Sequence, residues 1–213
     1  MRFSLILLNL FWVQELVARE IDRKIILFSL AYPVSRASFL AGRFAAVLIL
    51  SMLAAMVLGL LLLLAVTMGG GGYSQEFAPA LGAPFWATVA GFVLDAAVVA
   101  AFSLCIAALS TVSALPLALG AAFAVAGKAL GATLSYLSRG ADGDQEMLAR
   151  YNPIVELIRW VLPDLSRLDW REWSMYQLAP GAEIVFWSVT LAVAYIVLLL
   201  VGASLLLARR EFS

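Results

Sequence analysis

The sequence contains no histidine and only one cysteine, Cys105, among its 213 residues. Without histidine, the commonest general base and metal ligand of proteins is missing, and serine–histidine and cysteine–histidine nucleophile pairs cannot form within the chain. A single cysteine excludes an internal disulfide bond and every metal site built from paired cysteines. We therefore expect no intrinsic active site, no metal and no cofactor bound by this chain.

Charge is also scarce, at 13% of the sequence, whereas hydrophobic residues make up 64%. Soluble domains are about one quarter charged and about half apolar. The composition therefore excludes a soluble globular or disordered chain and indicates that a lipid bilayer surrounds most of it. The 14 basic residues equal the 14 acidic residues in number, so no basic excess points to nucleic acid as a partner.

Four apolar stretches exceed the roughly 20 residues that a helix needs to cross a bilayer. They are Phe44–Met68, Pro84–Leu109, Ala114–Leu137 and Ile184–Ala208. A fifth stretch, Phe3–Val17, is shorter and is interrupted by Gln14 and Glu15. These patterns predict an all-α fold: a polytopic membrane helix bundle over residues 1–213, with four full spans and a short N-terminal partial span.

The order of the spans places residues 18–43 and 209–213 on one side of the membrane and residues 138–183 on the other. The first side carries seven basic residues, and the loops of the second side carry five together with most of the acidic residues. Because basic loops favour the cytoplasm, we predict that residues 18–43 are cytoplasmic and that 138–183 form an extracytoplasmic loop. Asn152 and Pro153 are typical of a helix start, which predicts short loop helices, one of them at Pro153–Leu162.

Two ionisable residues, Asp95 and Lys128, lie deep in the predicted spans. They are equally distant in sequence from the centre of a predicted turn at Ser110–Ser113, so a helical hairpin would bring them to the same depth. Charges inside a membrane are costly and are usually paired or functional. We predict a structural ion pair, with the lining of a substrate path or a proton relay as alternatives. Gly127 and Gly131 form a small-residue patch that permits close helix packing.

The segment 18–43 begins with charged residues, continues with an apolar run and a proline, and returns to the membrane through basic residues. On physical grounds it is either an ordinary charged loop or a short helix on the membrane face that is offered to a soluble partner. The residues that form the pattern are Glu20, Asp22, Arg23, Pro33, Val34, Ser35, Arg36, Gly42 and Arg43.

This pattern resembles the permease subunits of type-two ABC exporters, the ABC-2 type transporter family. In that family the matching stretch joins the second and third spans and forms the coupling helix that docks on an ATPase. The order of the later spans and the outer-loop run at Leu162–Asp169 also agree, so the resemblance covers most of the chain from Phe3. The family usually has six spans; the usual first span is expected to be lacking, with Phe3–Val17 as the inner half of the second.

The resemblance implies a membrane-spanning permease subunit of an ATP-driven exporter in a bacterial-type cytoplasmic (inner) membrane. Its implied partners are an ABC ATPase subunit, which would hold ATP and Mg, a second permease copy and membrane lipid. The implied ATPase interface consists of Glu20, Asp22, Arg23, Lys24, Pro33, Ser35 and Arg36. The alternative is a non-transporting membrane scaffold that tethers a soluble partner through residues 18–36. Neither interpretation names a transported substrate.

Overall fold

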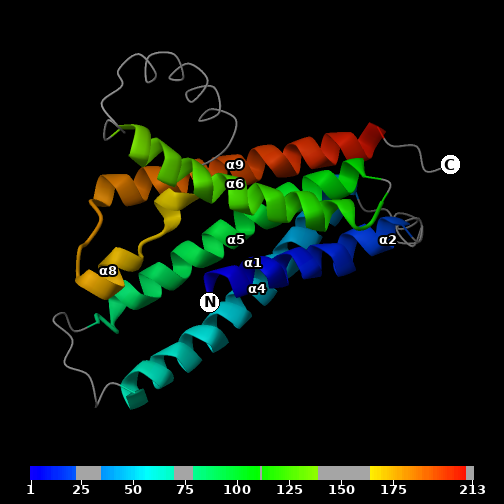
Figure 1. Ribbon diagram of the computed structural model, residues 1–213. Coiled ribbons are helices and arrows are strands. Elements are labelled where there is room, and N and C mark those ends of the chain that lie inside the picture. The colour runs from blue at the N-terminus through cyan, green and yellow to red at the C-terminus, as the bar shows by residue number, and fades with distance from the viewer. Residues whose placement is uncertain (23–34, 70–78, 111, 139–163, 210–213) are drawn as a thin grey trace.

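A computed structural model describes residues 1–22, 35–69, 79–110, 112–138 and 164–209, with the backbone alone at 21–22, 132–138 and 209. The regular structure of this part of the chain is entirely helical (Figure 1), which confirms the predicted all-α class. The elements are α1 (Arg2–Val13), the π-helical turn η1 (Gln14–Ala18), α2 (Arg19–Asp22), α4 (Arg36–Gly69), α5 (Ala83–Leu109), α6 (Leu115–Ser138), the 3₁₀ turn η3 (Leu165–Leu168), α8 (Arg171–Tyr176) and α9 (Ala182–Arg209).

Three helices, α4, α5 and α9, are long and apolar enough to cross a membrane, and they make the chain a multi-pass membrane protein. The helix α6 has 24 residues, but its apolar stretch with described side chains, Leu115–Gly131, is shorter than a span. The helix α1 has 12 residues and continues through η1 into α2. The predicted number of four full spans therefore stays a prediction.

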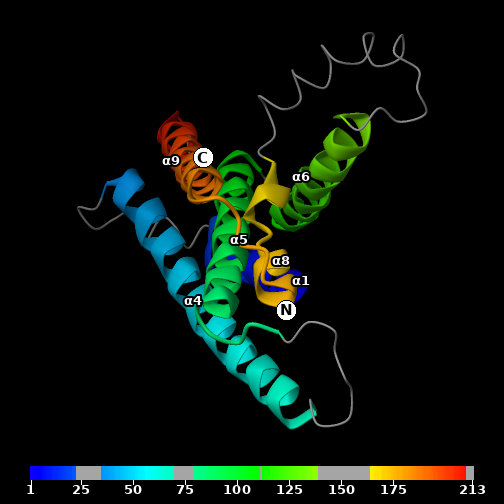
Figure 2. The same ribbon diagram turned by 90° about the vertical axis from the view of Figure 1, so that its left-hand side faces the viewer.

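The central helix is α5, on which α1, α4, α6 and α9 all pack (Figure 2). Its most apolar stretch is 72% buried, compared with 22% in α4 and 28% in α9. Small side chains explain this position, because alanines such as Ala96, Ala100 and Ala101 let neighbouring helices approach closely from several sides. In contrast, α4 turns Ile49 and Leu61 outward, each more than half exposed, as a lipid-facing helix does.

A short turn joins α5 to α6 where the sequence predicted one. The backbone of Ser110 is extended, which ends α5. The Ser110 hydroxyl accepts a hydrogen bond from the Val112 N–H at 3.0 Å, a serine turn that competes with further helix. Pro116 then lies in the first turn of α6, where its missing N–H costs nothing.

The residues between Asp164 and Tyr176 fold back onto the bundle. Leu165 and Leu168 are 1% and 3% exposed and belong to the same hydrophobic core as α5. Thr88 of α5 donates from Oγ1 to the carbonyl of Trp170 at 2.9 Å. Gly91 of α5 permits the contact, since a Cβ there would lie 2.5 Å from the Leu168 carbonyl oxygen. The segment 164–176 is therefore seated on α5.

The two ends of the bundle carry different segments (Figure 1). The start of α4 and the end of α9 meet at one end, where the Arg36 guanidinium donates to the carbonyls of Leu207 at 2.5 Å and Ala208 at 2.9 Å. We call this the Arg36 end, and the opposite one, near α8 and the starts of α5 and α9, the α8 end. The cytoplasmic assignment of the Arg36 end stays a prediction, and the predicted helix Pro153–Leu162 lies outside the described residues.

The orientation can be measured with introduced cysteines after Cys105→Ala has removed the native thiol. Ala37 at the Arg36 end and Leu178 at the α8 end both have exposed side chains. In intact cells, a membrane-impermeant maleimide should label Leu178→Cys, because we predict that the α8 end faces outward, and should reach Ala37→Cys only after permeabilisation. Labelling of Ala37→Cys alone in intact cells would show that the orientation is inverted.

Gly91→Ala should loosen the segment 164–176, because the added Cβ would lie 2.5 Å from the Leu168 carbonyl oxygen and 3.2 Å from the Trp170 ring. We expect a loss of about 1–3 kcal/mol in the free energy of unfolding, as is usual for overpacking, read from thermal unfolding in detergent. Gly42→Ala is the matched control, since nothing lies within 4 Å of a Cβ at Gly42. Equal responses of the two variants would contradict the seating on α5.

Candidate functional site

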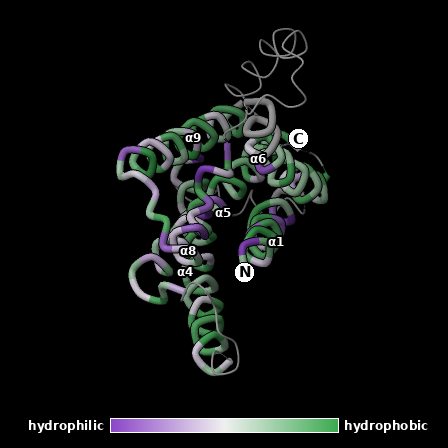
Figure 3. The backbone as a smooth tube through the Cα atoms, turned by 60° about the vertical axis from the view of Figure 1, so that its left-hand side comes forward, coloured by the Kyte–Doolittle hydropathy of each residue, from purple (hydrophilic) through white to green (hydrophobic). Residues whose placement is uncertain are grey.

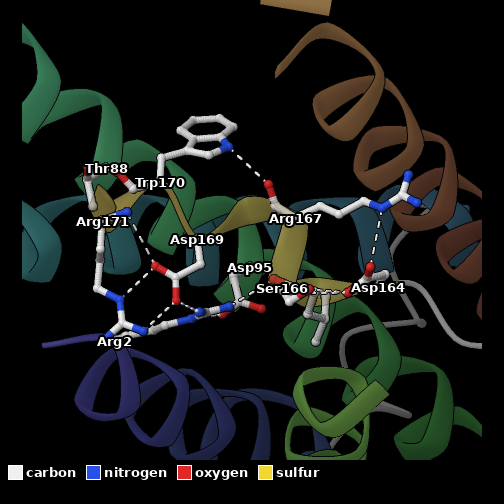
Figure 4. Close-up of polar contacts among 10 residues, drawn as sticks. Arg2, Thr88, Asp95, Asp164, Ser166, Arg167, Asp169, Trp170 and Arg171 are labelled. Atoms are coloured by element: carbon white, nitrogen blue, oxygen red, sulfur yellow. Dashed lines mark hydrogen bonds and ion pairs between the residues drawn. The ribbon is translucent and has the colours of Figure 1, made fainter. Parts of the chain in front are cut away.

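Five charged side chains form a charge cluster toward the α8 end of the bundle: Arg2, Asp95, Lys128, Asp169 and Arg171. Figure 4 shows four of them, Arg2, Asp95, Asp169 and Arg171. Figure 3 shows hydrophilic residues around α8 and at the start of α1. Arg2, 8% exposed, donates from Nε to Asp95 Oδ2 at 2.6 Å, from Nη1 to Asp169 Oδ2 at 2.7 Å and from Nη2 to the Leu165 carbonyl at 2.9 Å. One guanidinium therefore joins α1 to α5 and to the segment around η3.

Asp169 is shared between two arginines. Arg171 donates from Nε to Asp169 Oδ1 and from Nη2 to Oδ2, each at 2.7 Å. Burial raises the pKa of Asp169, but the hydrogen bonds and charge of Arg171 and the charge of Arg2 outweigh burial and hold this pKa below its usual value. Because the folded-state pKa lies below the unfolded value of about 3.9, these contacts stabilise the fold at neutral pH, and their contribution is lost as the pH falls through the folded-state pKa.

Among the described residues, Asp95 and Lys128 make no direct ion pair. Asp95 Oδ2 is bound by Arg2, and Asp95 Oδ1 has no hydrogen-bond partner in the described part of the chain. Lys128 places its Nζ 4.0 Å from the centroid of the Phe3 ring, a cation–π contact. The two residues are close enough for their charges to interact, but the rotation of each helix about its axis, which sequence spacing does not fix, directs them to other partners.

Two cavities adjoin the charge cluster. The larger, of about 510 Å³, is bordered by Arg2, Lys128, Asp169 and Arg171 and by apolar side chains that include Phe85, Phe92 and Met175. The smaller, of about 120 Å³, lies between α1 and α6 and is lined by Ile6, Leu7, Leu10, Ala121, Ala124 and Val125. Phe3 and Lys128 line both cavities, so these two side chains form the wall between a partly charged compartment and an apolar one.

Gly127 and Gly131, the two glycines of α6 that were predicted to permit close helix packing, have different surroundings. Gly127 is buried, but Gly131 faces η3, since a Cβ there would overlap the Ser166 side chain. The close approach of α6 to α5 and α1 occurs at Gly120, where a Cβ would overlap the Ser103 hydroxyl and the Leu10 side chain. The sequence analysis did not single out Gly120, although Gly120 and Ala124 show the same small-residue spacing as Gly127 and Gly131.

At the Arg36 end, three residues of the predicted ATPase interface have described side chains. Glu20 accepts hydrogen bonds from Arg43 Nη2 on both carboxylate oxygens, each at 2.6 Å. Ser35 precedes α4 and accepts the Ser38 N–H on its hydroxyl at 3.1 Å, as a helix N-cap does. Arg36 binds the carbonyls at the end of α9.

The other members of that predicted interface are not described at the level of side chains. Asp22 is the last residue of α2 and has a described backbone only. Arg23, Lys24 and Pro33 lie outside the described residues. Their proposed contact with an ATPase therefore stays a prediction.

The sequence analysis missed Arg2, Asp169 and Arg171 as members of the charge cluster. The sequence offers one signal for Arg2, which is the only charge ahead of the first apolar run. Asp169 lies in the run Leu162–Asp169, which was noted for its family resemblance and not for its charge. Among the described residues, no three acidic or cysteine side chains are grouped closely enough to hold a metal ion.

Comparison with protein-family models and with curated protein sequences finds no match for the chain. The link to type-two ABC exporters therefore depends on the motif residues of segment 18–43 and on the order of the apolar helices.

A double-mutant cycle tests whether Arg2 is the partner of Asp95. Arg2→Met and Asp95→Asn should each lower the free energy of unfolding by about 3–5 kcal/mol, the usual cost of removing one member of a buried ion pair. The double variant should lose clearly less than the sum of the two, because no charge is then left without its partner. Thermal unfolding of the full chain in detergent measures all four proteins.

The matched control combines Asp95→Asn with Lys128→Met. Because these two side chains make no direct contact and interact only through their charges, their coupling energy should be clearly smaller than that between Arg2 and Asp95. A larger coupling energy for Lys128 than for Arg2 would overturn the partner assignment.

Proposed function

We propose that the chain is the membrane-spanning permease subunit of an ATP-driven exporter of the type-two ABC class, which uses segment 18–43 as the docking surface for a separate ATPase subunit. The motif residues of that segment suggest the class. One structural observation supports the role: at the Arg36 end, two contacts tie together the ends of α2, α4 and α9, the helices before and after residues 23–34 among them.

The first contact is the ion pair between Glu20 and Arg43. Glu20 belongs to α2 and Arg43 to the second turn of α4, so the pair joins the helix before residues 23–34 to the helix after them. Both side chains are about one quarter exposed, at 22% and 27%, so water only partly screens their attraction.

The second contact is made by Arg36 with the carbonyls of Leu207 and Ala208 in the last turn of α9. These carbonyls have no partner within their own helix, and a cation there also meets the negative end of the helix dipole. Arg36 therefore connects the start of α4 to the end of α9.

These contacts give segment 23–34 a mechanical role in the proposal. The chain joins this segment to α2 at Asp22 and to α4 through Ser35, so a displacement imposed by an ATPase would be passed to α2, α4 and α9 together. Rigid helices that move in this way open and close a bundle, as a transport subunit requires. A passive scaffold would need the docking segment but not the connection between α4 and α9.

Photo-crosslinking tests the proposal with the full chain in its native membrane. A photoreactive residue at position 22 should capture a protein that is itself labelled by 8-azido-ATP, and excess ATP should suppress that label. The matched control carries the same residue at position 178, at the α8 end, and should not capture this protein. In a chain without a photoreactive residue, the paired reversal Asp22→Arg with Arg23→Asp should lower the amount of this protein that co-purifies with the chain several-fold while the chain stays in the membrane.

The outcomes separate the candidate functions. Capture from position 22 of a protein that does not bind ATP would favour the scaffold. Equal capture from positions 22 and 178, or no capture from position 22, would contradict docking through this segment.

A further inference from the structure

We propose that Lys128 and Phe3 form a binding site for one anionic phospholipid, whose phosphate pairs with the Lys128 ammonium and whose acyl chain lies in the apolar cavity between α1 and α6. This inference does not depend on the proposed transport function. It follows from the charge balance of the charge cluster, the shape of the two cavities and their access to the bilayer.

The charge balance leaves Lys128 without a carboxylate. Arg2 and Arg171 share Asp95 and Asp169 through hydrogen bonds of 2.6–2.7 Å. Lys128 makes no such contact among the described residues, and its cation–π contact with Phe3, at 4.0 Å, orients the ammonium without neutralising it. The cluster therefore carries one positive charge in excess. Since a lone charge inside a membrane is costly, an anion at Lys128 would be bound favourably.

The cavities supply separate compartments for the two parts of a phospholipid. The larger one extends from Lys128 to Ser174 and Met175 of α8 and is also bordered by the charged side chains of Arg2 and Arg171, which suits a hydrated glycerol phosphate headgroup. The smaller one is lined by apolar side chains apart from Lys128, which suits the part of an acyl chain nearest to the headgroup. The ammonium lies on the boundary between them, as the phosphate of a phospholipid lies between headgroup and chain.

The exposure of the apolar cavity at the surface of the bundle favours a lipid over a soluble anion as the ligand. The side chains of Leu7 and Val125, which line the apolar cavity, are 53% and 65% exposed. On a membrane protein, exposed apolar side chains at this depth of a helix face acyl chains. A lipid can therefore enter sideways between α1 and α6, and its chain adds apolar contacts that inorganic phosphate cannot make.

The first test measures lipid retention by the full-length, detergent-purified chain in native mass spectrometry, with phosphatidylglycerol and phosphatidylcholine as probes. We expect one tightly retained phosphatidylglycerol and weaker retention of phosphatidylcholine. Lys128→Met should weaken phosphatidylglycerol binding by about five- to tenfold, the usual effect of one cation on an anionic lipid. Lys128→Arg should restore it. Arg19→Gln is the matched control, since Arg19 is an exposed cation paired with Glu15 at the Arg36 end, and it should bind as the unmodified chain does.

A second measurement needs no change of Lys128. A phosphatidylglycerol with a photoreactive acyl chain should crosslink to peptides of α1 and α6 in the unmodified chain. Ala121→Phe, which fills the apolar cavity and keeps every charge, should reduce those adducts several-fold, and inorganic phosphate should not displace them.

Each contrary result overturns the proposal. Adducts confined to other helices would place the lipid elsewhere. Equal retention of phosphatidylglycerol by Lys128→Met and the unmodified chain would remove Lys128 from the site. Displacement by inorganic phosphate would assign the pocket to a free anion.

Discussion

The half of the bundle nearer to the α8 end depends on one buried guanidinium. Arg2 binds Asp95 of α5, Asp169 and the Leu165 carbonyl at the same time, and removing any buried partner leaves an uncompensated charge in a low dielectric. The start of α1, the middle of α5 and the segment 164–176 therefore have to adopt one relative arrangement. The start of α8 is held in the same arrangement, because Arg171 of α8 binds both carboxylate oxygens of Asp169. The charge cluster thus fixes where a loop meets the core.

The small residues of the central helices make that arrangement sterically possible. Gly91 of α5 leaves room for the Leu168 carbonyl, and Gly131 of α6 leaves room for the Ser166 side chain. The turn η3 can therefore pack closely against both α5 and α6. Gly120 brings α6 against α5 and α1. In contrast, α4 and α9 are mostly exposed along their apolar stretches, and Arg36 joins them at the opposite end. The bundle therefore combines a tightly packed centre with two peripheral helices that are linked to each other at the Arg36 end.

The fold class and the positions of α4, α5 and α9 could be predicted from the sequence, because long uncharged stretches have few alternatives to membrane helices. The turn after α5 was predictable for the same local reason, since Ser110 and Pro116 set helix ends. The partner of Asp95 was not, because Arg2 is 93 residues away in sequence and Asp169 is 167 residues from Arg2. Depth within a hairpin follows from counting residues, but the direction of a side chain depends on helix rotation, which these distant contacts decide. The same reason explains why Gly131 faces η3 and not α5.

Asp95 and Lys128 carry opposite charges but do not contact each other, and they have different roles in the charge cluster. Asp95 is fully buried and is committed to Arg2, whereas Lys128 is half-buried, lines both cavities and touches an aromatic face in place of a carboxylate. A direct Asp95–Lys128 pair would have neutralised both charges but would have released Arg2, and with it the anchor of segment 164–176. Because the arrangement uses Asp95 to hold the loop, it leaves the ammonium of Lys128 directed at a cavity. Asp95 thus has a structural role, and Lys128 is the member of the cluster that we propose binds lipid. Lys128 is left without a carboxylate because Asp95 is used, through Arg2, to hold segment 164–176.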